Sequence, residues 1–460
     1  MFRERVKEKT EQAEDEASKD AGHTPNEELP AGIFDGYQCS GNLEIDFHEL
    51  CALLDIKNIP TVCTEQTATS TTEMDEGLTD ASICFKPCLQ VELENENPLS
   101  AQKLKVFGWK IDDPTSRVLL KMFPSLVKLQ ILHFWQAGLT DQMVMSLMNT
   151  VSLCSNLRVL TLEGNPLPEQ SFHLLLSEDS VLTHLYLRNN RIGYEGARQI
   201  GSALSTTRSA NKNLILLNLA FNCIGDAGAA HIAQGLRFNR ALLMLSLCNN
   251  QIGDYGARHM AAILSEFALT HEEIVERRKM LLERKQPSPV GIDSDQPADH
   301  LSSVASSSSL SISKEANKGK KKKVPKKEKK SPAKKEKSNE KSPDIKVTPI
   351  KGGEQEEPEK PLNAQESVEP VNPLLDEPVH YRDGELFLPG NKTLASLNLA
   401  GNRITQKSLP LFLMSVERQG EGRRLLRLCL QRNRFPPECE YYVKIQELMN
   451  LRDPLKRKSC

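Results

Sequence analysis

The chain has 460 residues, and its 59 basic and 61 acidic residues leave a net charge of −2. This near balance excludes no class of partner, so the distribution of charge along the chain matters more than the sum. Eleven cysteines are scattered from Cys39 to Cys460, which favours free thiols in a reducing compartment over a disulfide framework. The sequence has no apolar run of membrane-spanning length and starts without the apolar segment of a signal peptide. We therefore expect a soluble, intracellular protein that does not enter a membrane.

The first hundred residues carry weak patterns. Residues 1–30 are highly charged and are predicted to be disordered. Residues 31–100 are predicted to be an N-terminal cap and loop region, because "NLEIDFHELCALLDIKNIP" holds enough apolar residues for a short docked helix. On paper Cys84, Cys88, His48 and Cys51 could supply four zinc ligands. Their spacing is irregular, so unpaired thiols are favoured and we predict neither a metal site nor a cofactor.

From residue 101 onwards one apolar frame returns repeatedly. The string "LLNLAFNCIGDAGAAHIAQGL" at 216–236 is followed by "MLSLCNNQIGDYGARHMAAIL" at 244–264. In both strings leucines first alternate as in a strand, and beyond the glycine the apolar spacing changes to that of one helix face. Each unit is therefore predicted to be a strand, a turn and a helix.

The frame LxxLxLxxNxI occurs six times. An upstream copy starting at Leu129 has Ala137 in the asparagine position, and a doubtful copy starts at Leu104, with Phe107 and Trp109 in leucine positions. In a stack of such units, the asparagine side chain is expected to bond backbone groups of the turn that neither strand nor helix satisfies. We predict this structural role for Asn165, Asn190, Asn222, Asn250, Asn402 and Asn433. Asp226 and Asp254 are predicted to be helix N-caps.

These residues resemble the leucine-rich repeat family, and "NxIGDxGAxxIAxxL" at Asn222 and Asn250 resembles its ribonuclease-inhibitor-like subtype. The resemblance implies an α/β fold, a leucine-rich repeat solenoid or horseshoe with a parallel sheet on the concave face and helices on the convex face. It also implies function through surface binding. Repeat proteins of this general kind occur in cilia and flagella, which suggests the axoneme as a location. Some activate a Ran-like GTPase, but they tend toward an acidic tail, whereas this chain ends "LKRKSC".

A long interruption separates Asn250 from Asn402. We predict repeats at 101–285 with an extended final helix, a disordered Ser/Lys-rich insertion at 286–380, two further repeats at 381–435, and a cap helix with a basic tail at 436–460. Closing such a loop costs on the order of 2.5 kcal/mol. Stacking one repeat on the next buries several leucines at about 1.5–3 kcal/mol each. One continuous solenoid is therefore expected, with a long disordered insertion at its edge.

Residues that alternate with the strand leucines are predicted to point to the concave face. Eight strands would span about 35–40 Å, a size that suits a protein partner better than a small molecule. No phosphate-binding loop and no catalytic motif is present, so we predict a non-enzymatic interaction scaffold. The predicted partner-binding residues are His133, Trp135, Glu163, His184, Tyr186, Arg188, Leu216, Asn218, Met244, Ser246, Asn398, Arg427 and Gln431. The alternative is that Trp135 packs under the N-terminal cap and that the small residues reflect drift between repeats.

The insertion raises a second hypothesis, because residues 314–346 hold fifteen lysines against five acidic residues. This charge could bind an acidic surface such as tubulin, bind nucleic acid, or direct nuclear import. The segment has no aromatic residue, which makes nucleic acid the less favoured partner. Candidate phosphorylation sites, each before a proline, are Ser288, Ser331, Ser342 and Thr348. The bland reading is a solvated linker. The expected location is cytoplasmic, in the ciliary or flagellar axoneme by resemblance, with the nucleus as the alternative.

Overall fold

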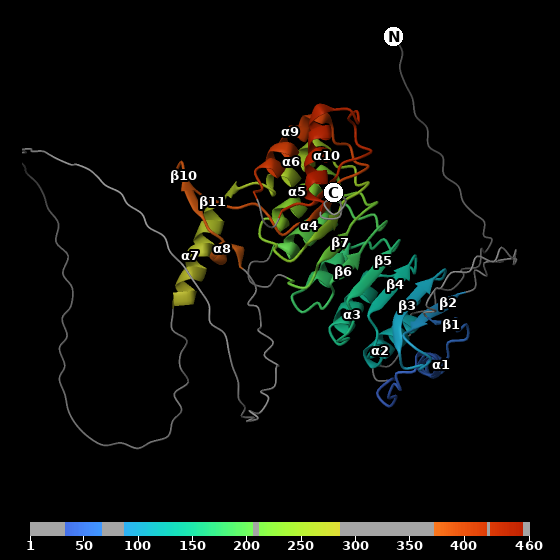
Figure 1. The fold of residues 1–460 in the computed structure, drawn as a ribbon. Helices are drawn as coiled ribbons and strands as arrows, with labels where there is room; N and C mark the ends of the chain where they lie inside the picture. The colour runs from blue at the N-terminus through green and yellow to red at the C-terminus, as the bar shows by residue number, and fades with distance from the viewer. Residues whose placement is uncertain (1–32, 67–86, 206–210, 286–371, 421–423, 454–460) are drawn as a thin grey trace, which may run out of the picture. The chain divides into compact units, whose positions relative to one another are not determined.

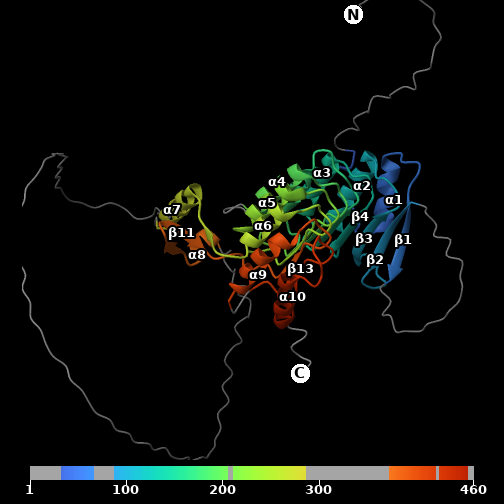
Figure 2. The same cartoon turned by 90° about the horizontal axis from the view of Figure 1, so that it is seen from above.

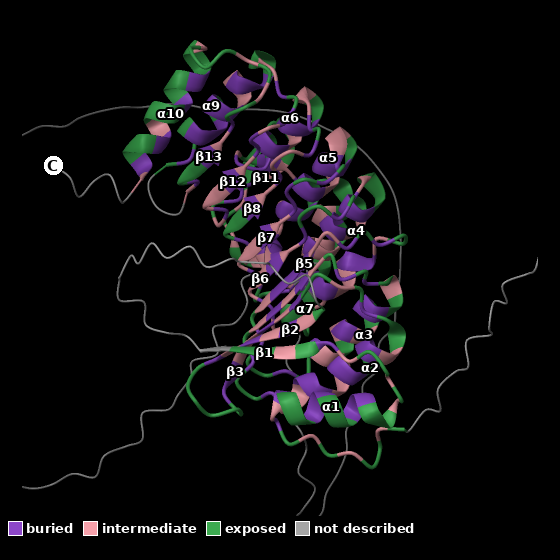
Figure 3. Ribbon diagram, turned by 90° about the vertical axis from the view of Figure 1, so that its right-hand side faces the viewer, coloured by how far each residue is buried: buried purple, intermediate pink, exposed green. Residues whose placement is uncertain are grey.

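The structure is a computed structural model of the chain and describes residues 33–66, 87–205, 211–285, 372–420 and 424–453. One sheet runs through it in the order β1-β2-β3-β4-β5-β6-β7-β8-β12-β13 (Figures 1 and 3), and only the pair β2 and β3 is antiparallel. Its strands are β1 Thr61–Gln66, β2 Cys88–Leu93, β3 Ala101–Phe107, β4 Ile131–Trp135, β5 Val159–Glu163, β6 His184–Tyr186, β7 Leu216–Asn218, β8 Met244–Ser246, β12 Ser396–Asn398 and β13 Arg427–Cys429. The predicted α/β repeat architecture is confirmed.

Helices alternate with the strands and cover one face of this sheet (Figures 2 and 3). The leucines of the frame point toward the helices, and one continuous hydrophobic core joins the repeats on both sides of the insertion. The helices are α1 Leu43–Leu53, α2 Asp113–Met122, α3 Asp141–Val151, α4 Tyr194–Leu204, α5 Gly225–Leu236, α6 Asp254–Ala262, α9 Leu409–Glu417 and α10 Glu440–Arg452, with 3-10 turns η1 Phe123–Ser125, η2 Ser171–Leu176 and η3 Gln406–Ser408.

The doubtful first repeat is a repeat in a different frame. Strand β3 pairs in parallel with β4, and its register sets Leu104 against Leu132 and Val106 against Phe134. The frame therefore starts at Ala101, not at Leu104. Phe107, which the sequence placed in a leucine position, lies on the opposite face and is 40% exposed. The alanine in the first leucine position hid this register.

The predicted extension of the final helix is wrong. Helix α6 ends at Ala262, and a two-residue strand, β9 Phe267–Ala268, precedes a separate helix, α7 His271–Lys285. Helix α7 begins with a capping box: Thr270 Oγ1 accepts from Glu273 N, and Glu273 Oε2 accepts from Thr270 N. The sequence "THEE" carries this signal for a new helix start.

Residues 372–380, predicted to belong to the disordered insertion, hold regular structure. They contain α8 Pro373–Asp376 and β10 His380–Arg382, and β10 pairs with β11 Glu385–Leu388, which pairs with β9. These elements share a small core with α7 (Figure 1), made of Phe267, Leu269, Met280, Leu374 and Leu388. The apolar residues on the two flanks of the insertion pack against one another. The sequence of either flank alone does not show this contact. Residues 286–371 lie outside the described residues.

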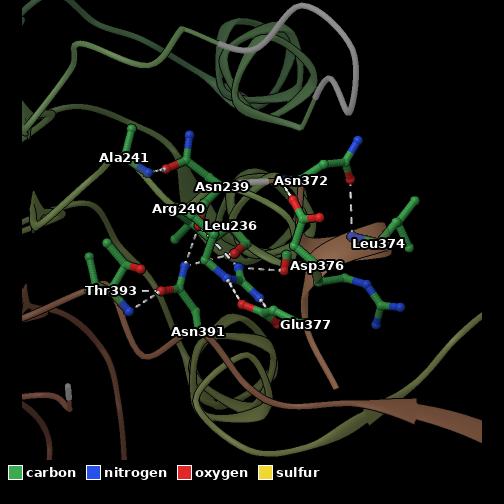
Figure 4. Close-up of polar contacts among 12 residues, drawn as sticks. Leu236, Asn239, Arg240, Ala241, Asn372, Leu374, Asp376, Glu377, Asn391 and Thr393 are labelled. Atoms are coloured by element: carbon green, nitrogen blue, oxygen red, sulfur yellow. Dashed lines mark hydrogen bonds and ion pairs between the residues drawn. The ribbon is translucent and has the colours of Figure 1, made fainter. Parts of the chain in front are cut away.

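One ion pair fastens this small core to the repeats, and another lies within it. Arg240 bonds Glu377 through two nitrogens, at 2.5 and 2.9 Å (Figure 4), with side chains 9% and 19% exposed. Arg284 at the end of α7 contacts Asp376 at 3.0 Å. The chain therefore leaves and re-enters the described structure at neighbouring points.

The insertion does not interrupt the sheet, because β8 pairs directly with β12. Asn402 Oδ1 accepts from Asn250 N and Ile252 N at 2.8 and 3.0 Å, and its Nδ2 donates to Leu247 O at 2.9 Å. Other asparagines of the frame bond the preceding repeat in the same manner, namely Asn165, Asn190, Asn222, Asn250 and Asn433. These side chains join backbone groups of neighbouring turns.

A second asparagine row, which sequence reasoning missed, lies just before strands β7, β8 and β12. Asn391 Nδ2 donates to Leu236 O and Asn239 O at 2.8 and 3.0 Å, while its Oδ1 accepts from Thr393 N and Leu394 N (Figure 4). Asn239 and Asn211 act in the same way one and two repeats earlier, respectively. Its signal is an asparagine three residues before the first leucine of the frame.

Asp226 and Asp254 are helix caps, but not of their own helices. The N-cap residues of α5 and α6, Ile224 and Gly253, make no side-chain capping bond of their own. Asp226 Oδ1 instead accepts from Gly253 N and Gly256 N, at 2.8 and 2.7 Å, at the start of the next helix. Asp254 bonds the repeat that follows the insertion, where it accepts from Thr405 N, Thr405 Oγ1 and Ser408 Oγ. The predicted caps thus connect successive repeats.

Replacing Asp254 by Asn should lower the free energy of unfolding at neutral pH by about 1–2 kcal/mol, since a charged acceptor of three bonds is lost. Partial burial raises the pKa of Asp254, but bonds from Ser408 and Thr405 outweigh it and hold the pKa below its ordinary value. A depressed pKa contributes stability above the unfolded value, about 4, which is lost as pH falls. Urea titrations should therefore show the deficit shrinking toward about pH 3.

Asp383→Asn is the matched control, because Asp383 is exposed and has a left-handed backbone that asparagine also tolerates. The idea is contradicted if Asp254→Asn and Asp383→Asn have equal stability at neutral pH.

Candidate protein-binding face

The face of the sheet opposite the helices is formed by three rows of side chains, and we call it the open sheet face. Backbone register defines the first two rows and the start of the third, and inter-strand hydrogen bonds continue the third. The first row holds His184, Leu216, Met244 and Arg427, the second holds His133, Tyr186, Asn218, Ser246 and Asn398, and the third holds Trp135, Glu163, Arg188 and Gln431. None of these thirteen predicted residues is buried.

Aromatic stacking marks the N-terminal end of the open sheet face. Phe107 and Trp135 stack with ring centroids 4.6 Å apart and planes 12° from parallel. Such a pair contributes about 0.5–1.5 kcal/mol beyond its buried area and holds both rings in place. Trp135 therefore packs on a neighbouring strand and not under the N-terminal cap, and half of this pair was missed because Phe107 was placed in the wrong frame.

Charged groups next to this stack are paired. Lys103 and Lys105 both contact Glu92, at 3.0 and 2.5 Å, across β2 and β3. Burial lowers the pKa of His133, and the two lysines lower it further, so this imidazole is neutral at physiological pH. A neutral imidazole offers one donor and one acceptor to a partner.

Glu163 and Arg188 adjoin each other in the third row, where Gly164 N donates to Arg188 O. Burial raises the pKa of the Glu163 carboxyl, and the positive charge of Arg188 opposes that rise. The Arg188 guanidinium lies 4.3 Å from the centroid of the Phe221 ring. This cation–π contact orients an exposed arginine over the sheet.

Phe221 has an unusual backbone conformation for its residue type. In every repeat, the residue directly before the asparagine position of the frame has a left-handed backbone. Most repeats have glycine or asparagine there, such as Gly164, Asn189, Asn249 and Gly401. Phe221 has φ of 59° there, and its side chain is 45% exposed. Left-handed backbone costs a bulky residue about 1–2 kcal/mol, and such strain is concentrated at functional sites. Aligning the repeats in the sequence would have revealed this exception.

The middle of the open sheet face is flat. Ala220 is only 6% exposed and offers little surface to a partner, whereas Met244 is 37% exposed. Asn218 and Asn398 use their side-chain oxygens to accept from Ala220 N and Ala400 N, at 3.0 Å each. The oxygens of both asparagines therefore hold the local turn, and the amide nitrogen of Asn398 also donates to Ser246 Oγ at 3.5 Å.

Several predicted features fall outside this face. Ser288, Ser331, Ser342, Thr348 and the lysine-rich stretch lie outside the described residues, as does Cys84 of the zinc candidates. Within the described ranges, no cluster of three or more His, Cys, Asp or Glu side chains is arranged to hold a metal ion. In the same part of the chain, no helix has the length and apolar character needed to cross a membrane.

Comparison with protein families gives one match. The Leucine Rich repeat model matches residues 179–201, 210–233 and 390–409. The first two segments include β6 and β7, and the third includes β12 beyond the insertion. The match therefore lies on both sides of the interruption, in agreement with the pairing of β8 and β12.

We expect Phe221→Asn to leave the stability unchanged or to raise it by up to about 1 kcal/mol, because relief of left-handed strain exceeds the lost cation–π contact. Asparagine is the residue that Asn189 and Asn249 supply at this position in adjacent repeats. Chemical denaturation measures the difference. A loss above about 1 kcal/mol would show that Phe221 is there for stability and not for recognition.

Proposed function

Because the chain is built of leucine-rich repeats, we propose that it is a non-enzymatic scaffold that binds a protein partner on the open sheet face. The observation that carries the proposal is the row of aromatic and cationic side chains held at fixed positions, with Phe107 stacked on Trp135 and Arg188 stacked on Phe221. Tryptophan, tyrosine and arginine are enriched at interface hot spots. A preordered face binds at a smaller entropic cost than a flexible one.

The size and chemistry of this face favour a macromolecule. Strands β3 to β13 span roughly 35 Å at about 4.8 Å per strand. The side chains on it are aromatic, amide, hydroxyl and guanidinium groups, which suit an irregular protein surface. The resemblance to the ribonuclease-inhibitor-like subtype supports the same conclusion, and its occurrence in cilia and flagella makes an axonemal partner part of the proposal.

Trp135→Ala with Tyr186→Ala should weaken partner binding by at least about 30-fold, as expected for loss of hot-spot side chains. The measurement is quantitative affinity purification from ciliated cells, followed by titration of the recovered partner. The matched control is Tyr194→Ala with Tyr255→Ala, whose side chains are 50% and 56% exposed on α4 and α6. Equal binding by a folded Trp135→Ala/Tyr186→Ala variant and by the control would refute this use of the face.

A second candidate function is electrostatic binding of an acidic surface, such as the microtubule lattice, by residues 314–346. The supporting observation is the excess of lysine in this stretch. In the described structure, the ion pairs Arg284–Asp376 and Arg240–Glu377 hold the chain on both sides of this segment, so the fold of the repeats does not depend on it. A change within the segment should therefore leave the repeats folded.

Replacing the fifteen lysines of residues 314–346 by glutamine tests this second function. If the segment binds microtubules, co-sedimentation with them should be lost and thermal unfolding should be unchanged, since the attraction depends on charge. A variant in which the ten serines of residues 287–313 are changed to alanine serves as the control, because it leaves the charge of the insertion unaltered. Unaltered co-sedimentation and cellular location would leave the open sheet face as the binding surface.

A further inference from the structure

Two arginines flank a row of small side chains in the C-terminal half of the open sheet face. Backbone hydrogen bonds set Arg188, Ala220, Cys248, Ala400 and Gln431 side by side on β6, β7, β8, β12 and β13 or directly after them: Asn189 N donates to Ala220 O, Phe221 N to Cys248 O, Asn249 N to Ala400 O, and Gly401 N to Gln431 O. Four strand spacings separate Arg188 from Gln431, or about 19 Å. Arg432 follows Gln431 directly. We call this set the arginine-flanked row.

The side chains in the middle of the arginine-flanked row are small and project little from the sheet. Ala220 and Ala400 are 6% and 1% exposed, and the half-buried Cys248 between them is the bulkiest side chain of the three. Equivalent positions toward the N-terminus carry Trp135 and Glu163. A group from a partner can therefore approach the backbone more closely here than elsewhere on the row.

Both arginines are exposed. Among the residues that the structure describes, neither Arg188 nor Arg432 has a carboxylate within ion-pair distance. Arg188 is oriented by the strained Phe221, and Arg432 itself has a left-handed backbone, with φ of 58°. Burial raises the pKa of the Cys248 thiol, and the charges of Arg432 and Arg188 oppose that rise. The positive charges of both guanidinium groups therefore act on the thiol of Cys248.

We propose that the arginine-flanked row binds an acidic segment of the protein partner, with carboxylates placed against Arg188 and Arg432 and the chain of that segment lying over Ala220, Cys248 and Ala400. The inference rests on the proposed function and specifies its partner. Charge complementarity selects the occupant, because unpaired guanidinium groups recognise carboxylates in a planar, two-bond geometry. Small floor residues select a segment that approaches closely, and not a bulky apolar one.

The thiol of Cys248 provides a test that needs no knowledge of the partner. The full-length protein is alkylated with iodoacetate, an anion, or with iodoacetamide, its neutral analogue, and mass spectrometry follows each cysteine peptide. The ratio of the two rates reports the local attraction for an anion, because thiol reactivity itself affects both reagents. The ratio at Cys248 should fall roughly threefold to fivefold in Arg188→Gln/Arg432→Gln, given two charges acting through a partly solvated medium.

The matched control is Arg258→Gln/Arg278→Gln, which removes the same charge from exposed positions on α6 and α7. Its ratio at Cys248 should equal that of the unaltered protein, and the exposed Cys63 reports the reagents in every digest. Equal ratios in the two double variants would overturn the proposal. So would a ratio at Cys248 that does not decrease with added salt, since screening weakens any attraction between exposed charges.

Occupancy by a protein segment is tested with a labelled peptide of alternating glutamate and serine, compared with its glutamine counterpart. The glutamate peptide should protect Cys248 from iodoacetamide in the unaltered protein and in the control, but not in Arg188→Gln/Arg432→Gln. Protection by inorganic phosphate but not by the peptide would instead indicate a small-anion site and would overturn the proposal. Failure of the proposed function is distinguishable, because loss of partner binding in Trp135→Ala/Tyr186→Ala does not depend on the chemistry at Cys248.

Discussion

The asparagine side chain that joins each turn to the next is the interaction on which the rest of the structure depends. Each repeat ends its strand with a left-handed residue, which leaves turn amides and carbonyls that no strand or helix can satisfy. Asn402 shows how they are satisfied, since one side chain serves Asn250, Ile252 and Leu247 of the preceding repeat. This bond is local in space and indifferent to separation along the chain. Two repeats interrupted by a long segment can therefore stack as if they were consecutive.

The same constraint explains which side chains repeat from unit to unit and which vary. The core leucines and the asparagines of the frame have the same environment from repeat to repeat. Packing and buried polar groups therefore fix their identity. Side chains on the open sheet face have no such requirement, and they differ from strand to strand. Arg188 and Phe221 are the extreme case, because Phe221 occupies a backbone conformation that its neighbours give to glycine or asparagine. The left-handed backbone of the bulky Phe221, whose ring holds Arg188 over the sheet, is the feature that most clearly distinguishes this part of the face from its neighbours.

The sequence predicted the repeats well because periodicity directly reflects burial, and the strands of β4 to β13 follow the leucine frame. It failed where a contact depends on two distant segments. Phe267 and Leu374 form a small core only when both flanks of the insertion meet, and Asp254 caps a helix of another repeat. The face residues were placed on the correct side of the sheet, but Phe107 and Arg432 were missed. The first was hidden by an alanine in a leucine position, and the second by lying three residues beyond the end of β13.

The ion pair between Arg240 and Glu377 has a mechanical consequence. Both side chains are largely enclosed, and the contact stands between the insertion and the repeats. Tension applied through the insertion would reach α7 and α8 first, and it would have to separate Arg240 from Glu377 before loading the hydrogen bonds between β8 and β12. Those bonds lie in a parallel ladder that shares a load among several strands. The small core of α7 and α8 would therefore bear a pull on the insertion before the pairing of β8 with β12 does.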